Sequence, residues 1–378
     1  MKIYLDNAAT TVPDPRVIKA MDAFLGKRVG NASSLHSVGF QAAVAVEQAR
    51  EIIAGRIHAR PEEIYFTSGG TESNNWAIKG IAFTRGRKKG HIIVSEIEHP
   101  SVLEPVRWLE KQGFRVSYVG VDREGIVSVG DVRKAMTAKT FLVSIMHANN
   151  EIGTLQPVSE IGRLCREERV FFHTDACQSF TKENIDVRCD SLDLVTLSSH
   201  KIHGPRGVGV LYIRGGVKIE PMMHGGKQEY GKRAGTYNTE AIVGFSKAVE
   251  IASVGDAVKV ARLRDYFIGK IEAKIEDVVL YGSRHKRLCH IVNFAFKDVE
   301  GKPLAALLNK KGIFISTGSA CSANSLEPSH VVLALQMSAA SAHGAVRISL
   351  SKWTTKKEID RAVASFQRTV DHLRKLKR

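Results

Sequence analysis

Short apolar runs alternate with longer segments of helical periodicity through the first two thirds of the chain. The apolar runs predict strands over residues 64–67, 91–95, 116–119, 141–147, 170–173, 192–197 and 207–213. Apolar residues at helical spacing predict helices over 15–25, 37–55, 73–83, 101–112 and 157–168. Because strands that are apolar throughout are buried on both faces, this order predicts an α/β fold, with a mostly parallel sheet covered by helices.

The alternation loosens after the last of these strands. A Gly-rich segment over 224–236 predicts a mobile loop, and one helical run is expected over 239–276. The remaining pattern predicts strands over 291–296, 313–316 and 345–349 and helices over 303–311 and 355–376. We therefore predict a large domain over 15–255 and a smaller α+β domain formed by 1–14 and 256–378.

The composition excludes several classes of protein. With 43% hydrophobic and 25% charged residues over 378 positions, the chain is typical of a globular protein with a large core. No apolar run approaches the ~20 residues of a membrane span, and no signal-peptide pattern is present, which favours the cytoplasm. The net charge is +16, but the basic residues are dispersed rather than clustered in one patch. RNA is therefore a less favoured partner.

The five cysteines have no spacing typical of zinc or iron–sulfur ligands, so no metal is expected. Their scattered placement instead favours a reducing compartment. Cys177 is interpreted as a packing residue.

Polar residues follow the carboxyl ends of several predicted strands, where ligands of parallel sheets bind. Residues 68–73 form a Gly-containing turn that opens a helix, an arrangement suited to a phosphate group. The other members of this set are His99, Asn150, Asp175, Gln178 and Lys201. Each alone has a structural interpretation, as a cap, a turn residue or a structural histidine. Their shared placement favours a binding site.

Lys201 follows an apolar strand and is flanked by a serine, two histidines and a Gly-rich turn. An ammonium that lies near other cations and is partly desolvated loses its proton more easily, and the free amine can form an imine with an aldehyde. The segment therefore suits pyridoxal 5'-phosphate.

A series of motifs, in matching order, covers nearly the whole chain. They are LDNAATT (5–11), NASSLH (31–36), TSGGTESNN (67–75), EHPSVL (98–103), HANNEIGTLQPV (147–158), HTDACQSF (173–180), SSHKIHGPRGVGVLYIR (198–214), RAGT (233–236), STGSACSANSLEPS (316–329) and VRISLSKWTT (346–355). In these motifs the chain closely resembles the NifS/IscS-like cysteine desulfurases. These are pyridoxal-phosphate enzymes of the class V aminotransferase family, with the aspartate aminotransferase fold (fold type I).

The resemblance implies a homodimer and a set of residue roles. Lys201 would carry the cofactor as an imine, Asp175 would pair with the pyridine nitrogen, Gln178 would contact the ring oxygen, and the catalytic His99 would stack on the ring. The phosphate is expected among Gly70, Thr71, Ser198, His200 and, across the dimer interface, Thr236. A carboxylate at the pyridine nitrogen keeps that nitrogen protonated, which lets the ring accept electron density.

Two further residues are assigned to the substrate and the sulfur. Arg347 offers a bidentate fork for the carboxylate of L-cysteine, with Asn150 as a second donor near cofactor and substrate, although a surface ion pair is an alternative for Arg347. Cys321 lies among small polar residues, so we expect an exposed thiol. Its thiolate can attack the substrate sulfur, which leaves a persulfide on Cys321 and L-alanine as the other product.

The leading hypothesis is a cysteine desulfurase that passes sulfur to an acceptor or scaffold protein, for iron–sulfur cluster assembly or thiolation. A selenocysteine lyase or another class V enzyme, such as an aminotransferase, is the alternative, and a sulfur-delivery or RNA-binding subunit is a third hypothesis. Lys227 and Tyr230 depart from the family pattern, which leaves open how a partner docks at their loop. The sequence also leaves open the identity of the acceptor.

Overall fold

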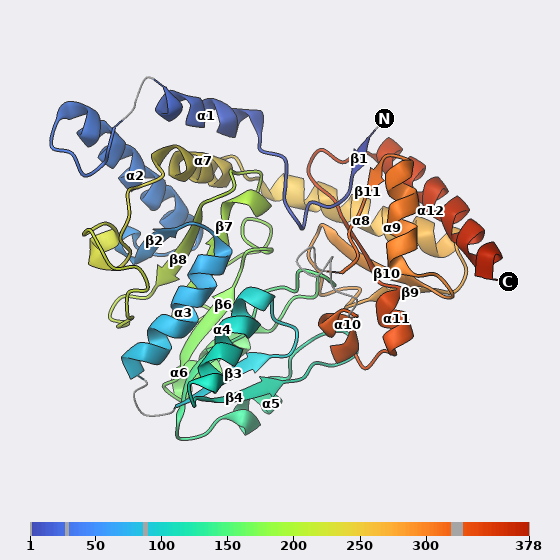
Figure 1. Cartoon of the computed structure of the whole chain (residues 1–378), viewed down its shortest axis with the longest axis horizontal. Helices are drawn as coiled ribbons and strands as arrows, with labels where there is room; N and C mark the ends of the chain where they lie inside the picture. Colours follow the sequence, from blue (N-terminus) through green and yellow to red (C-terminus); the bar gives the residue numbers. More distant parts are fainter. Residues whose placement is uncertain (1, 27–29, 86–89, 319–327, 378) are drawn as a thin grey trace.

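The largest sheet is built from the first two thirds of the chain. The structure, a computed structural model, describes residues 2–26, 30–85, 90–318 and 328–377. Within them this sheet has the strand order β2-β8-β7-β6-β5-β3-β4 (Figure 1). Its strands are β2 (Ile64–Thr67), β3 (His91–Ser95), β4 (Arg115–Val119), β5 (Thr140–Ser144), β6 (Phe171–Asp175), β7 (Leu194–Ser198) and β8 (Gly209–Ile213). Only β8 runs antiparallel to its neighbours β2 and β7, so the predicted mostly parallel sheet is confirmed.

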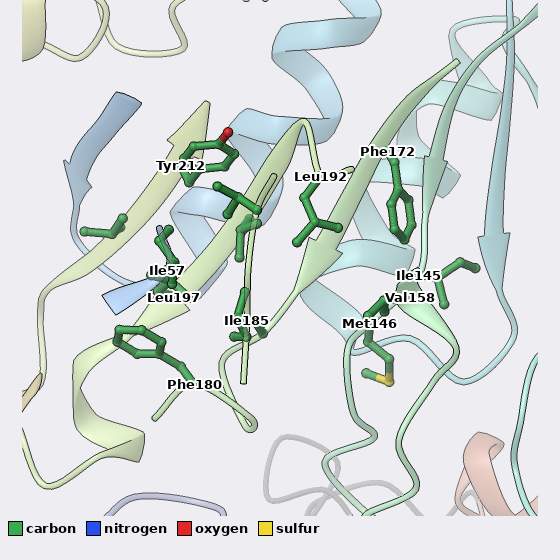
Figure 2. Packing of buried hydrophobic residues seen from close by; sticks show 14 of the residues in the cluster. Ile57, Ile145, Met146, Val158, Phe172, Phe180, Ile185, Leu192, Leu197 and Tyr212 are labelled. Carbon is green, nitrogen blue, oxygen red and sulfur yellow. The ribbon is translucent and has the colours of Figure 1, made fainter. Parts of the chain in front are cut away.

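Helices cover both faces of this sheet. Apolar residues of α3 (Gly70–Arg85) and α4 (Pro100–Lys111) pack against one face, and α1 (Pro15–Leu25), α2 (Ser37–Arg56), α6 (Val158–Glu167) and α7 (Thr239–Glu250) contribute to the cluster on the other. Neighbouring residues of one strand point to opposite faces, so Leu194 of β7 joins the α3–α4 cluster whereas Val195 and Leu197 join the other. Figure 2 shows part of that second cluster, including Leu197, Phe172 and Tyr212.

The end of the chain forms a second packed group, on the right of Figure 1. Its antiparallel sheet has the order β12-β10-β9, from β12 (Val346–Ser349), β10 (Ile291–Phe296) and β9 (Val278–Tyr281). It is covered by α8 (Val254–Lys274), α9 (Gly301–Lys310) and α12 (Lys356–Lys377), whose apolar residues join one cluster. The N-terminal strand β1 (Ile3–Tyr4) pairs with β11 (Ile313–Phe314) in the same group. The exact domain boundaries remain a prediction.

Several short elements and several boundaries differ from the sequence expectation; for example, α3 starts at Gly70 rather than at residue 73, and β5 ends at Ser144 rather than at residue 147. The run expected as one helix over 239–276 is two helices, α7 and α8, because the Ser253 side chain accepts a hydrogen bond from the Gly255 amide and caps a new helix start. The short helices α5 (Val129–Ala135), α10 (His330–Ala334) and α11 (Ala339–His343), together with β9, were not predicted. In the described part of the chain, no helix combines the length and the apolar character needed to cross a membrane.

The Gly-rich segment predicted as a mobile loop over 224–236 is held by a buried ion pair. The Arg50 guanidinium donates to both carboxylate oxygens of Glu229, each at 2.9 Å, and the side chains are only 1% and 2% exposed. The Phe66 amide donates to the same carboxylate at 2.8 Å. The segment is therefore anchored to α2 and β2, which the Gly-rich composition did not reveal.

Replacing Glu229 with alanine should destabilise the protein by about 3 kcal/mol, because it leaves the Arg50 charge buried with one remaining carboxylate, that of Glu47. The midpoint of urea unfolding measures this loss. Glu47→Gln is the matched control, since the Glu47 side chain is 52% exposed and its ion pair should contribute less than about 1 kcal/mol. Equal shifts in the two variants would contradict the assignment.

Candidate active site

A cavity of about 220 Å³ lies at the carboxyl ends of β5, β6 and β7, beside the first turn of α3. It is lined by many of the residues predicted from the sequence: Gly70, Thr71, His99, Asn150, Asp175, Gln178, Ser198, His200, Lys201 and Arg347. Thr236 does not line this cavity and is exposed. Cys321 lies outside the described residues.

Lys201 ends a short 3-10 turn, η2 (Ser199–Lys201), directly after β7. Its Nζ donates to the backbone oxygens of Ala8 and Ala9, at 2.5 and 2.8 Å. These carbonyls belong to the N-terminal motif LDNAATT, for which the sequence suggested no individual role. The two carbonyls hold the amine of Lys201 at the cavity wall.

Asp175 is the last residue of β6, and two donors orient its carboxylate. The Cys177 amide donates to Oδ1 at 2.9 Å, and Asn74 Nδ2 donates to Oδ2 at 2.7 Å. Asn74 also donates to Ser101 Oγ, which is 2.7 Å from His99 Nδ1. The sequence analysis missed Asn74 and Ser101, although Asn74 lies one helical turn beyond Gly70 and therefore on the same helix face.

His99 and its neighbour Glu98 are both held in their neutral forms. Burial lowers the pKa of His99, whose Nδ1 caps α4 by accepting from the Ser101 amide. Desolvation raises the pKa of Glu98 to about 8, although Ser95 Oγ and the Met146 amide donate to its Oε1. At pH 7 a neutral imidazole and a neutral acid therefore stand side by side at the end of β3.

One end of the cavity has the features of a phosphate site. Gly70 starts α3, and a Cβ at this position would lie 2.7 Å from Cys177 Sγ, so a side chain larger than hydrogen would force a shift. The buried Ser198 Oγ has no hydrogen-bond partner among the described residues. Burial, assisted by the charges of Lys201 and Arg206, lowers the pKa of His200 to about 4, which leaves a neutral ring. A hydroxyl, an imidazole and free helix amides suit an anion.

Arg347 reaches the cavity from β12 and is only 2% exposed. One terminal nitrogen donates to the Asn150 carbonyl at 2.9 Å and the other to Asp6 Oδ1 at 3.0 Å. Its Nε has no partner among the residues that the structure describes. Arg347 therefore does form an ion pair, with Asp6, but its guanidinium is buried rather than at the surface, and its role toward the substrate stays a prediction.

Comparison with known proteins identifies the family to which the chain belongs. The family model for aminotransferase class V matches residues 3–362. The chain is 48% identical over 378 residues to the cysteine desulfurase IscS of Dictyoglomus turgidum, covering 99% of this chain and 95% of the relative. It is 46% identical over 380 residues to the cysteine desulfurase IscS of Clostridium botulinum, covering 99% and 96%.

Solved structures agree with the sequence matches. A NifS-like protein superposes with a TM-score of 0.93 at 37% identity, covering 98% of this chain and 100% of that one. A second structure, SspA in complex with cysteine, has a TM-score of 0.85 at 39% identity, covering 94% and 100%. The chain belongs to the class V aminotransferases, and within that family to the cysteine desulfurases. Its fold is that of the fold type I enzymes.

Enzymes of this family depend on pyridoxal phosphate, and the cavity fits that group. The orphaned Ser198 hydroxyl and the glycine at position 70 suit its phosphate, and the oriented Asp175 carboxylate suits its ring nitrogen. The buried Gln178 Oε1 also has no partner in the described structure, while Gln178 Nε2 donates to the Ala8 carbonyl at 2.9 Å. Unpaired polar atoms of Ser198 and Gln178 thus lie in side chains that line the same cavity.

Two buried histidines, His173 and His147, lie within β6 and three residues after β5. His173 bonds to Ser144 Oγ at 2.8 Å and Thr196 Oγ1 at 3.1 Å, and His147 Nδ1 lies 2.7 Å from Ser179 Oγ. Desolvation lowers the pKa of each to about 4. Each ring is thus neutral in the folded protein near pH 5 but protonated in the unfolded chain.

Acid should therefore destabilise the fold. The folded-state pKa is about 4 and the ordinary value is about 6.5. The contribution of each neutral ring to the free energy of unfolding is therefore complete above pH 6.5 and is lost as the pH falls towards 4. In His147→Gln the loss of unfolding free energy over this interval should be smaller by on the order of 3 kcal/mol. Urea unfolding at several pH values measures it, with the exposed His372→Gln as the control; identical pH profiles in wild type and His147→Gln would refute the assignment.

Proposed function

We propose that the chain works as a cytoplasmic homodimer that converts L-cysteine into L-alanine and collects the sulfur on Cys321 as a persulfide. The single observation that carries the proposal is one cavity lined by the Lys201 amine, the oriented Asp175 carboxylate and the buried Arg347 guanidinium. The solved relative described as a complex with cysteine supports cysteine as the substrate.

Each side chain then has a defined task. When bound, pyridoxal phosphate withdraws electrons from the α-carbon of the attached amino acid. Asp175 would hold a proton at the ring nitrogen of the cofactor, and the neutral imidazole of His99 would lie against the ring. Arg347 and Asn150 bind and orient the substrate carboxylate. Lys201, whose amine lies at the cavity wall, would be the base that moves protons at the α-carbon.

Sulfur transfer requires a nucleophile, for which we propose the Cys321 thiolate. It attacks the γ-sulfur of the substrate, so that a sulfur–sulfur bond forms and the carbon–sulfur bond breaks. The electron pair of the broken bond stays with the three-carbon fragment, which takes up protons and leaves as alanine. No external oxidant is needed, because the sulfur atom is transferred as sulfane sulfur while the carbon fragment is reduced.

Release of alanine and sulfide from L-cysteine, with dithiothreitol as reductant, tests the activity. We expect equal amounts of the two products, and a purified protein that carries the cofactor but forms neither would overturn the proposal. Faster turnover of selenocysteine, or a requirement for a 2-oxo acid, would instead favour a selenocysteine lyase or an aminotransferase.

The downstream role is proposed by similarity to the IscS relatives: the persulfide passes to an acceptor or scaffold protein for iron–sulfur assembly or thiolation. Thr236 is exposed and outside the cavity of its own chain, which suits a contribution to the phosphate site of a second subunit. Sedimentation should give a dimer. RNA is the less favoured partner, and binding that is absent or insensitive to salt would exclude it.

Asn74→Ala should weaken binding of the cofactor about tenfold, because the buried Asp175 carboxylate loses a hydrogen-bond donor at 2.7 Å. Dissociation of pyridoxal phosphate, followed by its absorbance, measures the effect. Asn75→Ala is the matched control, since this neighbouring asparagine is half-buried, does not line the cavity and donates to the Thr71 carbonyl in an exposed hydrogen bond. Unchanged affinity in Asn74→Ala would contradict the role given to Asn74.

A further inference from the structure

Lys201 lines two cavities, and it is the residue that they share. The second cavity has a volume of about 70 Å³ and lies between the segment after β6, the α7–α8 junction and the segment after β12. This space accepts a molecule of only a few heavy atoms. Neither the sequence motifs nor the proposed reaction assigns it a function.

The polar side of the second cavity contains an ammonium without a carboxylate partner. Lys182 Nζ donates to the backbone oxygens of Gln178 and Lys201, both at 3.0 Å. Within the described parts of the chain no acidic side chain forms an ion pair with Lys182. Two neutral carbonyls therefore occupy two of its three donors, and one donor remains for a ligand.

The other charges around the second cavity do not form an ion pair with Lys182, although the charge of the neighbouring Glu183 acts on it. Lys352 is already paired with Asp14, with 2.6 Å between Nζ and Oδ2. Asp256 is the one acid that lines the cavity, and it lies in the first turn of α8. His290, 3% exposed, also lines the cavity, and its Nδ1 has no partner among the described residues.

The opposite side is apolar. Its wall is made by apolar side chains of α7, of α8, of the segment between them and of one residue after β12: Ala248, Ala257, Val260, Ala252 and Leu350. An inorganic anion makes no favourable apolar contact with such a wall, whereas a short alkyl chain is stabilised by burying its apolar area against it. The ligand should therefore carry one negative charge at one end and a small apolar group at the other.

We propose that this cavity binds a short-chain monocarboxylate, of the size of propionate, with its carboxylate on Lys182 and its alkyl group against Ala252 and Val260. This second cavity is linked to the active site through Lys182 Nζ. The same ammonium that would bind the carboxylate also donates to the backbone oxygen of Lys201. The proposal does not depend on the desulfurase reaction.

Calorimetric titration of the cofactor-loaded protein with sodium propionate, in chloride buffer, tests the site. We expect saturable binding that weakens at least tenfold in Lys182→Met and also in Ala252→Leu, which fills the apolar wall without changing the charge. Lys247→Met, the control on α7, should bind like the wild type, because Lys247 pairs with Glu250 on the surface. Propionamide, the neutral analogue, should not compete.

Three results would overturn the proposal. They are absence of saturable binding, unchanged binding in Ala252→Leu, or binding that is lost only in Arg347→Lys, which would place propionate in the active-site cavity instead. Thermal unfolding of each variant verifies that it is folded. Because Ala252 does not line the active-site cavity, Ala252→Leu keeps the test valid if Lys182→Met fails to fold.

Discussion

Replacing Lys201 with alanine is expected to lower turnover of L-cysteine by about 10³-fold, because the substitution removes both the general base and the amine that binds the cofactor. The amine of Lys201 lies at the cavity wall, 2.5 and 2.8 Å from the carbonyl oxygens of Ala8 and Ala9. Alanine cannot attach the cofactor covalently or move a proton at the substrate. Borohydride reduction followed by peptide mass spectrometry should find the cofactor on the Lys201 peptide of the wild type alone.

Lys201→Arg separates the charge of this residue from its chemistry. Arginine keeps a positive charge and can donate to the same carbonyls, but it stays protonated at any working pH and forms no imine. We expect this variant to be as inactive as Lys201→Ala. If Lys201→Arg retained most of the turnover, the lysine would act only as a fixed cation and the mechanism would be wrong.

Replacing Cys321 with serine should leave the bound cofactor and its visible absorbance intact while sulfide release falls by about 10²-fold or more. A serine hydroxyl is almost never ionised near pH 7, so it lacks the nucleophile that a thiolate supplies. Mass spectrometry after treatment with L-cysteine measures the effect directly. The wild type should gain the mass of one sulfur atom on the Cys321 peptide, and Cys321→Ser should gain none.

Cys189→Ser is the matched control, because Cys189 is an exposed free cysteine in the described part of the chain. It should retain both turnover and the sulfur on the Cys321 peptide. The half-buried Cys177 and the buried Cys289 are poor alternatives, since desolvation raises the pKa of Cys177 well above its ordinary value and that of Cys289 to about 11. Extra sulfur found on Cys177 or Cys289, with none on Cys321, would assign the nucleophile elsewhere.

Much of the fold was accessible from hydrophobic periodicity. The strand over 64–67 and the helix starting at residue 15 were predicted at their observed bounds, because each is a strong local pattern. The failures have local causes too. The break between α7 and α8 depends on one serine cap, and β9 is a short strand with an exposed Val279. A single capping residue and a strand of four residues are both too short to produce a periodic hydrophobic pattern that can be recognised in the sequence.

Part of the candidate site could be predicted from the sequence, and part could not. Residues that follow strands, such as Asp175 and Lys201, could be selected because the carboxyl ends of parallel strands share one edge. The residues that orient them could not. Asn74 holds Asp175 from 101 positions away, and Asp6 contacts Arg347 across 341 positions. Such partners have no spacing in the sequence that marks them.

The amino-acid sequence alone determined the class of the fold, the family and the identity of the chemical groups, because these depend on local periodicity and on ordered motifs. Tertiary structure decided which neutral or charged state those groups adopt and which partners hold them. The physical reason is that burial and hydrogen bonding act through space. The pKa of Glu98 rises and that of His200 falls only once the folded chain has removed water from both.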